Sequence, residues 1–64
     1  MTIKDDLKAI NKDISKAKNF KWQVKRAEYW ISKLNNIYPD YIFEAVLTED
    51  EENVEIIYVL KVVY

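Results

Sequence analysis

The stretch KNFKWQVKRAEYW, residues 18–30, places four aromatic side chains among three lysines and one arginine. Aromatic rings stack on nucleic-acid bases while lysines neutralise phosphates. Trp, Tyr and Arg are also the residues that dominate the energetic centres of protein–protein interfaces. The stretch therefore predicts a surface that recognises a protein or a nucleic acid, unless its rings are buried in the core.

At helical spacing this stretch divides into two sides. Phe20 and Trp30 fall on or beside an apolar stripe, and we expect both in the core. The opposite side carries two aromatic and three basic residues. The alternative is that the helix is covered on both sides, with Trp22 packed inside and Arg26 stacked over a ring. We predict that the polar side binds a partner through Trp22, Lys25, Arg26, Tyr29 and Lys33.

Nucleic acid is the alternative ligand of the same helix, over residues 18–33. The chain as a whole argues against it, because its pI is about 5.3, whereas nucleic-acid-binding domains commonly exceed a pI of about 9. No helix-turn-helix, zinc or RNA-recognition signature accompanies the basic residues. Protein binding is therefore the first prediction. A nucleic acid would contact Lys18, Lys21, Trp22, Lys25, Arg26 and Lys33.

A second charged cluster, TEDEEN at residues 48–53, contains four consecutive acids. The glycine-containing spacing of a calcium loop is missing. Such a run is typical of a solvated hairpin tip, and it discourages pairing of nearby strand edges. It can also present an acidic patch to a basic partner through Glu49, Asp50, Glu51 and Glu52.

The composition offers little support for catalysis. The chain has no His and no Cys, so the commonest acid–base group, the thiol nucleophile and the softer metal ligands are missing. Ser15 and Ser32 have no neighbouring base in the pattern. We therefore expect a protein that is not an enzyme and that holds no metal and no cofactor.

The length of 64 residues implies a single domain over residues 1–64. A domain this small is marginally stable, and it usually needs a disulfide, a metal or a partner subunit. Charge is divided unevenly along the chain. Residues 1–36 hold nine basic and four acidic residues, whereas residues 37–64 hold one basic and seven acidic residues. These halves could attract each other, or one of them could meet a charged partner.

Apolar residues at helical spacing predict helices over residues 3–17 and 20–37. Nothing between residues 16 and 20 is a strong helix breaker, so one long, broken helix is the alternative. We favour two helices, because a single long helix would leave half of its apolar stripe uncovered in a monomer.

Capping residues support this division. Thr2 and Asn19 are suited to accept hydrogen bonds in the first turns. Asn35 and Asn36 could supply a left-handed C-cap to the second helix, and Pro39 prevents its continuation.

Alternating apolar residues predict strands over residues 41–48 and 54–63, joined as an antiparallel β-hairpin. The chain is therefore predicted to be an α+β domain in ααββ order. The register with the best apolar pairing sets Thr48 opposite Asn53. It also pairs Leu47 with Val54, Ala45 with Ile56, Phe43 with Tyr58 and Tyr41 with Leu60.

The other face of this hairpin is also largely apolar, with Ile42, Val46, Ile57, Val59 and Val63. A sheet face in contact with water should be more polar. The second strand also outruns the first, and a bare strand edge invites pairing with another chain. We therefore predict a homodimer, formed through the Val54–Tyr64 strand edge or through the second helix.

No signal sequence is evident, and no apolar run approaches the length of a membrane span. The sequence therefore predicts a cytoplasmic, intracellular protein without a membrane segment. The function it favours is that of a small protein-binding module that modulates or inhibits a larger protein. Compact chains rich in Lys, Ile, Asn and Tyr are common among phage and mobile-element accessory proteins, so we expect such a role.

Overall fold

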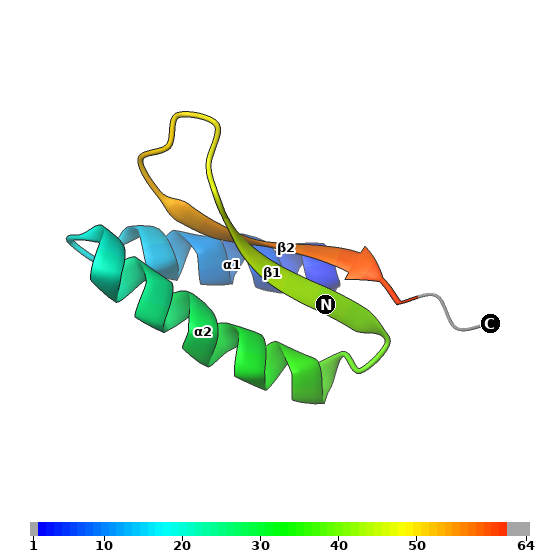
Figure 1. The fold of residues 1–64 in the computed structure, drawn as a ribbon. Coiled ribbons are helices and arrows are strands. Elements are labelled where there is room, and N and C mark those ends of the chain that lie inside the picture. The colour runs from blue at the N-terminus through cyan, green and yellow to red at the C-terminus, as the bar shows by residue number, and fades with distance from the viewer. Residues whose placement is uncertain (1, 62–64) are drawn as a thin grey trace.

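The computed structural model describes residues 2–61 and confirms an α+β domain in ααββ order. The elements are helices α1 (Ile3–Ser15) and α2 (Phe20–Ile37), followed by strands β1 (Tyr41–Leu47) and β2 (Val54–Leu60) (Figure 1). The two helices are separate, so the single long helix is excluded.

Both predicted N-caps are confirmed. The Thr2 hydroxyl accepts a hydrogen bond from the Asp5 N–H at 3.3 Å, and the Asn19 carbonyl oxygen of the side chain accepts one from the Trp22 N–H at 3.0 Å. Helix α1 ends at Ser15, two residues earlier than predicted. The early end leaves residues 16–19 to turn the chain, so that α2 can pack against α1.

The predicted left-handed C-cap at Asn35 or Asn36 is wrong. Helix α2 continues to Ile37, and Tyr38 caps it with a φ of −124°, donating its N–H to the Leu34 carbonyl at 2.8 Å. Pro39 accounts for this end, because a proline disfavours helical geometry in the residue before it. The Tyr38 hydroxyl also donates a hydrogen bond to Asp6 of α1, and this bond raises the pKa of Tyr38.

The predicted hairpin register is confirmed in full: Leu47 pairs with Val54, Ala45 with Ile56, Phe43 with Tyr58 and Tyr41 with Leu60. Strand β1 ends at Leu47, one residue earlier than predicted, and β2 ends at Leu60, so that Lys61 lies just beyond it. Residues 62–63, the last two of the predicted second strand, lie outside the described residues. Without a glycine in the chain, the turn places Glu51 in the left-handed region, at a φ of 59°.

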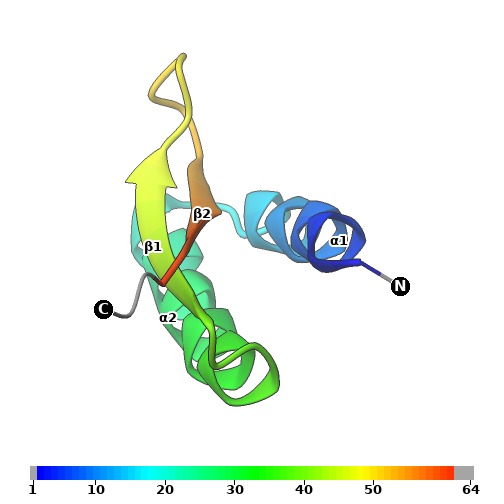
Figure 2. The same cartoon turned by 90° about the vertical axis from the view of Figure 1, so that its right-hand side faces the viewer.

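The core lies where the two helices meet one face of the hairpin. Helix α1 contacts β2 and α2, whereas α2 contacts both strands. Figure 2 shows this arrangement, with α1 beside β2 and β1 on the far side of the hairpin from α1. The buried apolar residues are Leu7, Ile10, Ile14, Ala17, Ala27, Leu34, Phe43, Val54 and Ile56.

Helix α2 is rotated about its axis relative to the predicted apolar stripe. Its most buried positions are Gln23, Ala27 and Leu34, while Phe20 is 58% exposed. The prediction that Phe20 lies in the core is therefore wrong. The rotation arises because α2 packs against α1 as well as the hairpin. The side of α2 that faces both neighbours carries Gln23, whereas Phe20 lies at the border of that side.

Gln23 is a buried polar residue that the sequence pattern did not indicate. Its side-chain amide nitrogen donates to the Ala17 carbonyl at 3.3 Å and to the Asn53 side-chain oxygen at 3.1 Å. Its side-chain oxygen accepts the Val54 N–H at 2.8 Å. These bonds satisfy a buried amide, and they join the loop between the helices to the base of the hairpin turn.

Candidate protein-binding surface

Two large aromatic side chains of α2 are exposed, as the sequence predicted for a binding surface. Trp22 is 54% exposed and Tyr29 is 55% exposed. The alternative in which Trp22 packs inside is wrong. The Lys25 ammonium lies 5.2 Å from the Trp22 ring centre, and the Lys33 ammonium lies 5.0 Å from the Tyr29 ring centre. We call Trp22, Lys25, Tyr29 and Lys33 the outer face of α2.

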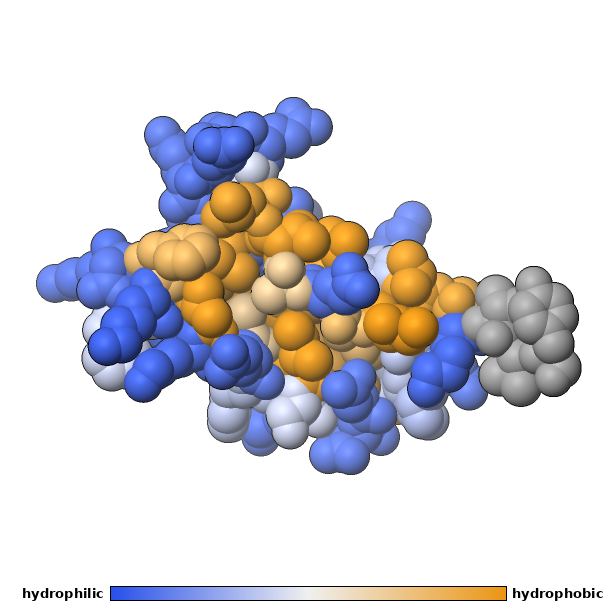
Figure 3. All heavy atoms as spheres, viewed as in Figure 1, coloured by the Kyte–Doolittle hydropathy of each residue, from blue (hydrophilic) through white to orange (hydrophobic). Residues whose placement is uncertain are grey.

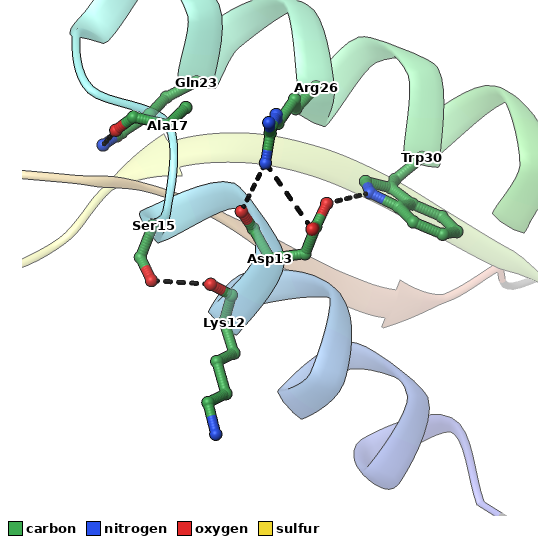
Figure 4. Close-up of polar contacts among 7 residues, drawn as sticks. All are labelled: Lys12, Asp13, Ser15, Ala17, Gln23, Arg26 and Trp30. Atoms are coloured by element: carbon green, nitrogen blue, oxygen red, sulfur yellow. Dashed lines mark hydrogen bonds and ion pairs between the residues drawn. The ribbon is translucent and has the colours of Figure 1, made fainter.

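Arg26 borders this face but turns toward α1. Its guanidinium donates to the Asp13 backbone carbonyl at 3.0 Å and lies 3.5 Å from an oxygen of the Asp13 carboxylate (Figure 4). No ring within residues 2–61 lies under the Arg26 guanidinium, as the buried alternative required. Its side chain remains 45% exposed, so a partner on the outer face can still reach it.

Asp13 of α1 holds Trp30 of α2 in place. Its other carboxylate oxygen accepts a hydrogen bond from the Trp30 indole N–H at 3.1 Å (Figure 4). Trp30 is half-buried against the core, and its ring meets that of Tyr29 edge to face, with centroids 5.3 Å apart. Asp13 thus fixes Trp30, and Trp30 limits the positions open to Tyr29. Sequence reasoning missed Asp13, because nothing in α1 alone marks it.

An apolar groove adjoins the outer face. It lies between α1 and α2, has a volume of about 250 Å³, and is lined by Ile10, Trp30, Lys33 and Ile37, among others. Because Lys33 belongs to both surfaces, a partner that contacts Lys33 can also insert an apolar side chain into the groove.

The predicted acidic patch forms the tip of the hairpin, and its four acids, Glu49, Asp50, Glu51 and Glu52, are all exposed. The Thr48 hydroxyl donates to the Asp50 carboxylate, and this bond is the main reason why the pKa of Asp50 is lowered. The Glu52 N–H also donates to Asp50 at 3.1 Å. The tip is therefore a hydrogen-bonded turn.

Among the described residues, no ion pair joins the basic half of the chain to the acidic half. Between residues 2 and 61 the one salt bridge joins Arg26 to Asp13, and both belong to the basic half. The lysines of the outer face and the acids of the hairpin tip therefore remain available to charged groups on other molecules.

No helix within residues 2–61 combines the length and the apolar character needed to cross a bilayer. Comparisons with protein-family models, with curated proteins and with solved structures gave no match to this chain.

Proposed function

We propose that this chain is a protein-binding module without catalytic activity, which docks on a larger protein and modulates or inhibits it. The observation that carries the proposal is the exposure of Trp22 and Tyr29 on one helix face. Aromatic side chains bury about 150–250 Å² each. Covering the exposed half of both rings would remove about 200 Å² from water and contribute about 5 kcal/mol to binding.

The charge of the outer face indicates which chemical groups a partner surface would need. Lys25 and Lys33 lie over the rings, and neither has a carboxylate within salt-bridge distance among residues 2–61. A partner surface that combines carboxylates with an apolar side chain for the neighbouring groove fits this pattern. Rigid aromatic anchors surrounded by complementary charge are typical of interface hot spots. Covering such a surface would block the other contacts of the partner, which is how a module this small could inhibit. A phage or mobile-element accessory protein would act in this way.

The test is to find the partner and measure which residues bind it. A photoreactive amino acid placed at position 29 should cross-link the partner in nuclease-treated lysate, while the same group at position 60 should not. Leu60 is the matched control, because it is 62% exposed but lies on β2. With the purified partner, we expect Trp22→Ala to weaken binding about 30-fold, the effect of a hot spot of about 2 kcal/mol, and Leu60→Ala to leave it unchanged.

Two outcomes would overturn this proposal. The first is equal loss of affinity in Trp22→Ala and Leu60→Ala. The second is capture that disappears with nuclease, falls steeply with salt, and is abolished by Lys25→Glu with Arg26→Glu. That behaviour is expected of phosphate contacts, and it would establish nucleic acid as the ligand of α2.

A further inference from the structure

The two edges of the hairpin are covered unequally. The Thr48 N–H donates to the Asn53 carbonyl, and the Lys61 N–H donates to the Asp40 carbonyl. Hydrogen-bonded and non-hydrogen-bonded residue pairs alternate along an antiparallel ladder. In each strand, therefore, the backbone N–H and carbonyl groups of successive residues point alternately toward the partner strand and away from it. The groups of Phe43, Ala45 and Leu47 point away from β2, and those of Val54, Ile56 and Tyr58 point away from β1.

Side chains from both helices occupy the first half of the β2 edge. The Asn11 side-chain oxygen accepts the Ile56 N–H at 2.7 Å, and the Asn11 side-chain nitrogen donates to the Ile56 carbonyl at 3.2 Å. Gln23 accepts the Val54 N–H. Asn11 thus takes the place of a neighbouring strand, so the homodimer predicted through the Val54–Tyr64 edge would find that edge partly occupied.

The β1 edge is open. Among the described residues, no side chain or strand bonds the outward N–H and carbonyl groups of Phe43, Ala45 and Leu47. Helix α1 does not reach β1. Figure 3 views the molecule from the β1 side and shows apolar residues gathered over β1 and the adjoining part of α2. An unpaired strand edge with apolar surroundings is a site for pairing with another chain.

Near this edge, some side chains of β1 are exposed although they point to the face of the hairpin that the helices cover. Ala45 and Leu47 share their side of the sheet with buried Phe43, yet Ala45 is exposed and Leu47 is 47% exposed. On α2, Phe20, Val24 and Ile31 follow one another along the side next to the buried line. Phe20 is largely exposed, and Val24 and Ile31 are only half-buried. The apolar layer between helix and sheet therefore reaches the surface at the β1 edge.

We infer that a second copy of this chain covers this edge. Two β1 strands pair in antiparallel orientation about a two-fold axis at Ala45. The result is a four-stranded sheet in the order β2–β1–β1–β2, with both copies of α2 on one face. The exposed Phe20 and Leu47 then continue a single apolar layer across the interface.

The side chains of β1 suit pairing with an identical strand. With Ala45 at the axis, Phe43 of one copy faces Leu47 of the other, and Glu44 faces Val46. Like charges are therefore not directly opposed, whereas an axis at Glu44 would set two carboxylates against each other. The neighbouring flank of α2 is bordered by Lys21 and Glu28, one residue of each sign, so two flanks can approach without net repulsion.

The outer face of α2 is less suited to self-association. It carries Lys25 and Lys33 without an acid, so two copies would bring like charges together. The β1 edge and the outer face lie on different sides of α2. The inference about β1 therefore does not depend on the proposed function, and either can fail without the other.

Two measurements test the inference. Light scattering should give twice the chain mass of 7.7 kDa for the wild type. Ala45→Lys, which would set two ammonium groups opposite each other at the axis, should give a monomer. Ala45 is exposed, so the lysine has room in the folded monomer, and circular dichroism verifies that the variant remains folded.

Cross-linking then tests the register, since the natural chain has no cysteine. In the proposed dimer Glu44 and Val46 form a non-hydrogen-bonded pair, with Cα atoms about 4.5 Å apart, which a disulfide can bridge. The diagonal 44–44 and 46–46 separations are about 8 Å and cannot be bridged. A mixture of Glu44→Cys and Val46→Cys chains should therefore oxidise mainly to mixed dimers, whereas either chain alone should form its own dimer much more slowly. Mass spectrometry distinguishes the products.

A wild-type chain that stays at 7.7 kDa at millimolar concentration would overturn the inference; the edge would then be open or covered by a different protein. A dimer in which mixed cross-links are not favoured would overturn it too, because the copies would be joined elsewhere. If Ala45→Lys does not fold, the cysteine pair still decides between these outcomes.

Discussion

Asn11 is the residue whose replacement should most clearly show how the sheet edge is protected. Its side-chain amide makes two hydrogen bonds to the backbone of Ile56, at 2.7 and 3.2 Å, across 45 positions of sequence. Asn11→Ala removes both bonds and leaves the outward groups of Ile56 without a protein partner. The Ala side chain itself is compatible with the helix.

The expected loss follows from these contacts. A hydrogen bond contributes about 1 kcal/mol net, so the two bonds contribute about 2 kcal/mol. The helix propensity of Ala offsets about 0.5 kcal/mol of this, leaving a loss of about 1.5 kcal/mol. Domains have about 0.05–0.15 kcal/mol of stability per residue, so the loss is a large fraction of the total. It corresponds to a decrease in Tm of about 10 °C.

The assay is urea and thermal unfolding followed by circular dichroism, with amide hydrogen exchange at Ile56 as a local probe. Asn36→Ala is the matched control, because Asn36 is exposed on α2 and should change stability by less than about 0.5 kcal/mol. Faster exchange at Ile56 in Asn11→Ala alone would locate the effect. Equal stability of the two variants would refute the role of Asn11 in covering the edge.

Two further predictions concern the hairpin tip. Glu51 has a φ of 59°, which costs a residue with a Cβ atom about 1–2 kcal/mol. Glu51→Gly should therefore raise the free energy of unfolding by about 0.5 kcal/mol after the entropy cost of glycine. If Glu51→Gly instead lowers the free energy of unfolding as much as Glu52→Gly does, this explanation is wrong. The Thr48 hydroxyl holds the pKa of Asp50 below its usual 3.8, so Thr48→Val should raise that pKa, as followed by carbon-detected NMR titration. Because the folded-state pKa is the lower one, the bond stabilises the wild type above pH 3.8 and this contribution disappears as the pH falls through the folded-state pKa. An unchanged Asp50 pKa in Thr48→Val would exclude the hydroxyl as the cause.

The parts of the fold that could be predicted are those fixed by neighbouring residues. Thr2 and Asn19 cap the helices because their side chains reach N–H groups three positions away. The strand register could be predicted because a shift of one residue would exchange the two faces of the hairpin. Trp22 and Tyr29 could be placed outside because they lie opposite the apolar stripe.

The parts that could not be predicted depend on contacts between distant elements. Asn11, Asp13 and Gln23 resemble ordinary surface residues in the sequence, and their partners lie in other elements. Phe20 was misplaced for the same reason, since the rotation of α2 is set by α1 and the hairpin together. For the same reason the sequence could not show which strand edge is open for pairing. Only the hydrogen bonds of Asn11 and Gln23 to the outer edge of β2 distinguish that edge from the edge of β1.

The placement of α1 explains why, within residues 2–61, the β2 edge is partly covered and the β1 edge is not. A connection of four residues, 16–19, returns the chain from α1 to α2, so the helices must pack as neighbours. The hairpin face can then be covered by α2 across both strands, but α1 is left on the side of β2. Within residues 2–61, no element covers the outer edge of β1. The second copy that we infer would cover this edge, and it would leave the outer face of α2 on each copy free for the protein partner that we propose.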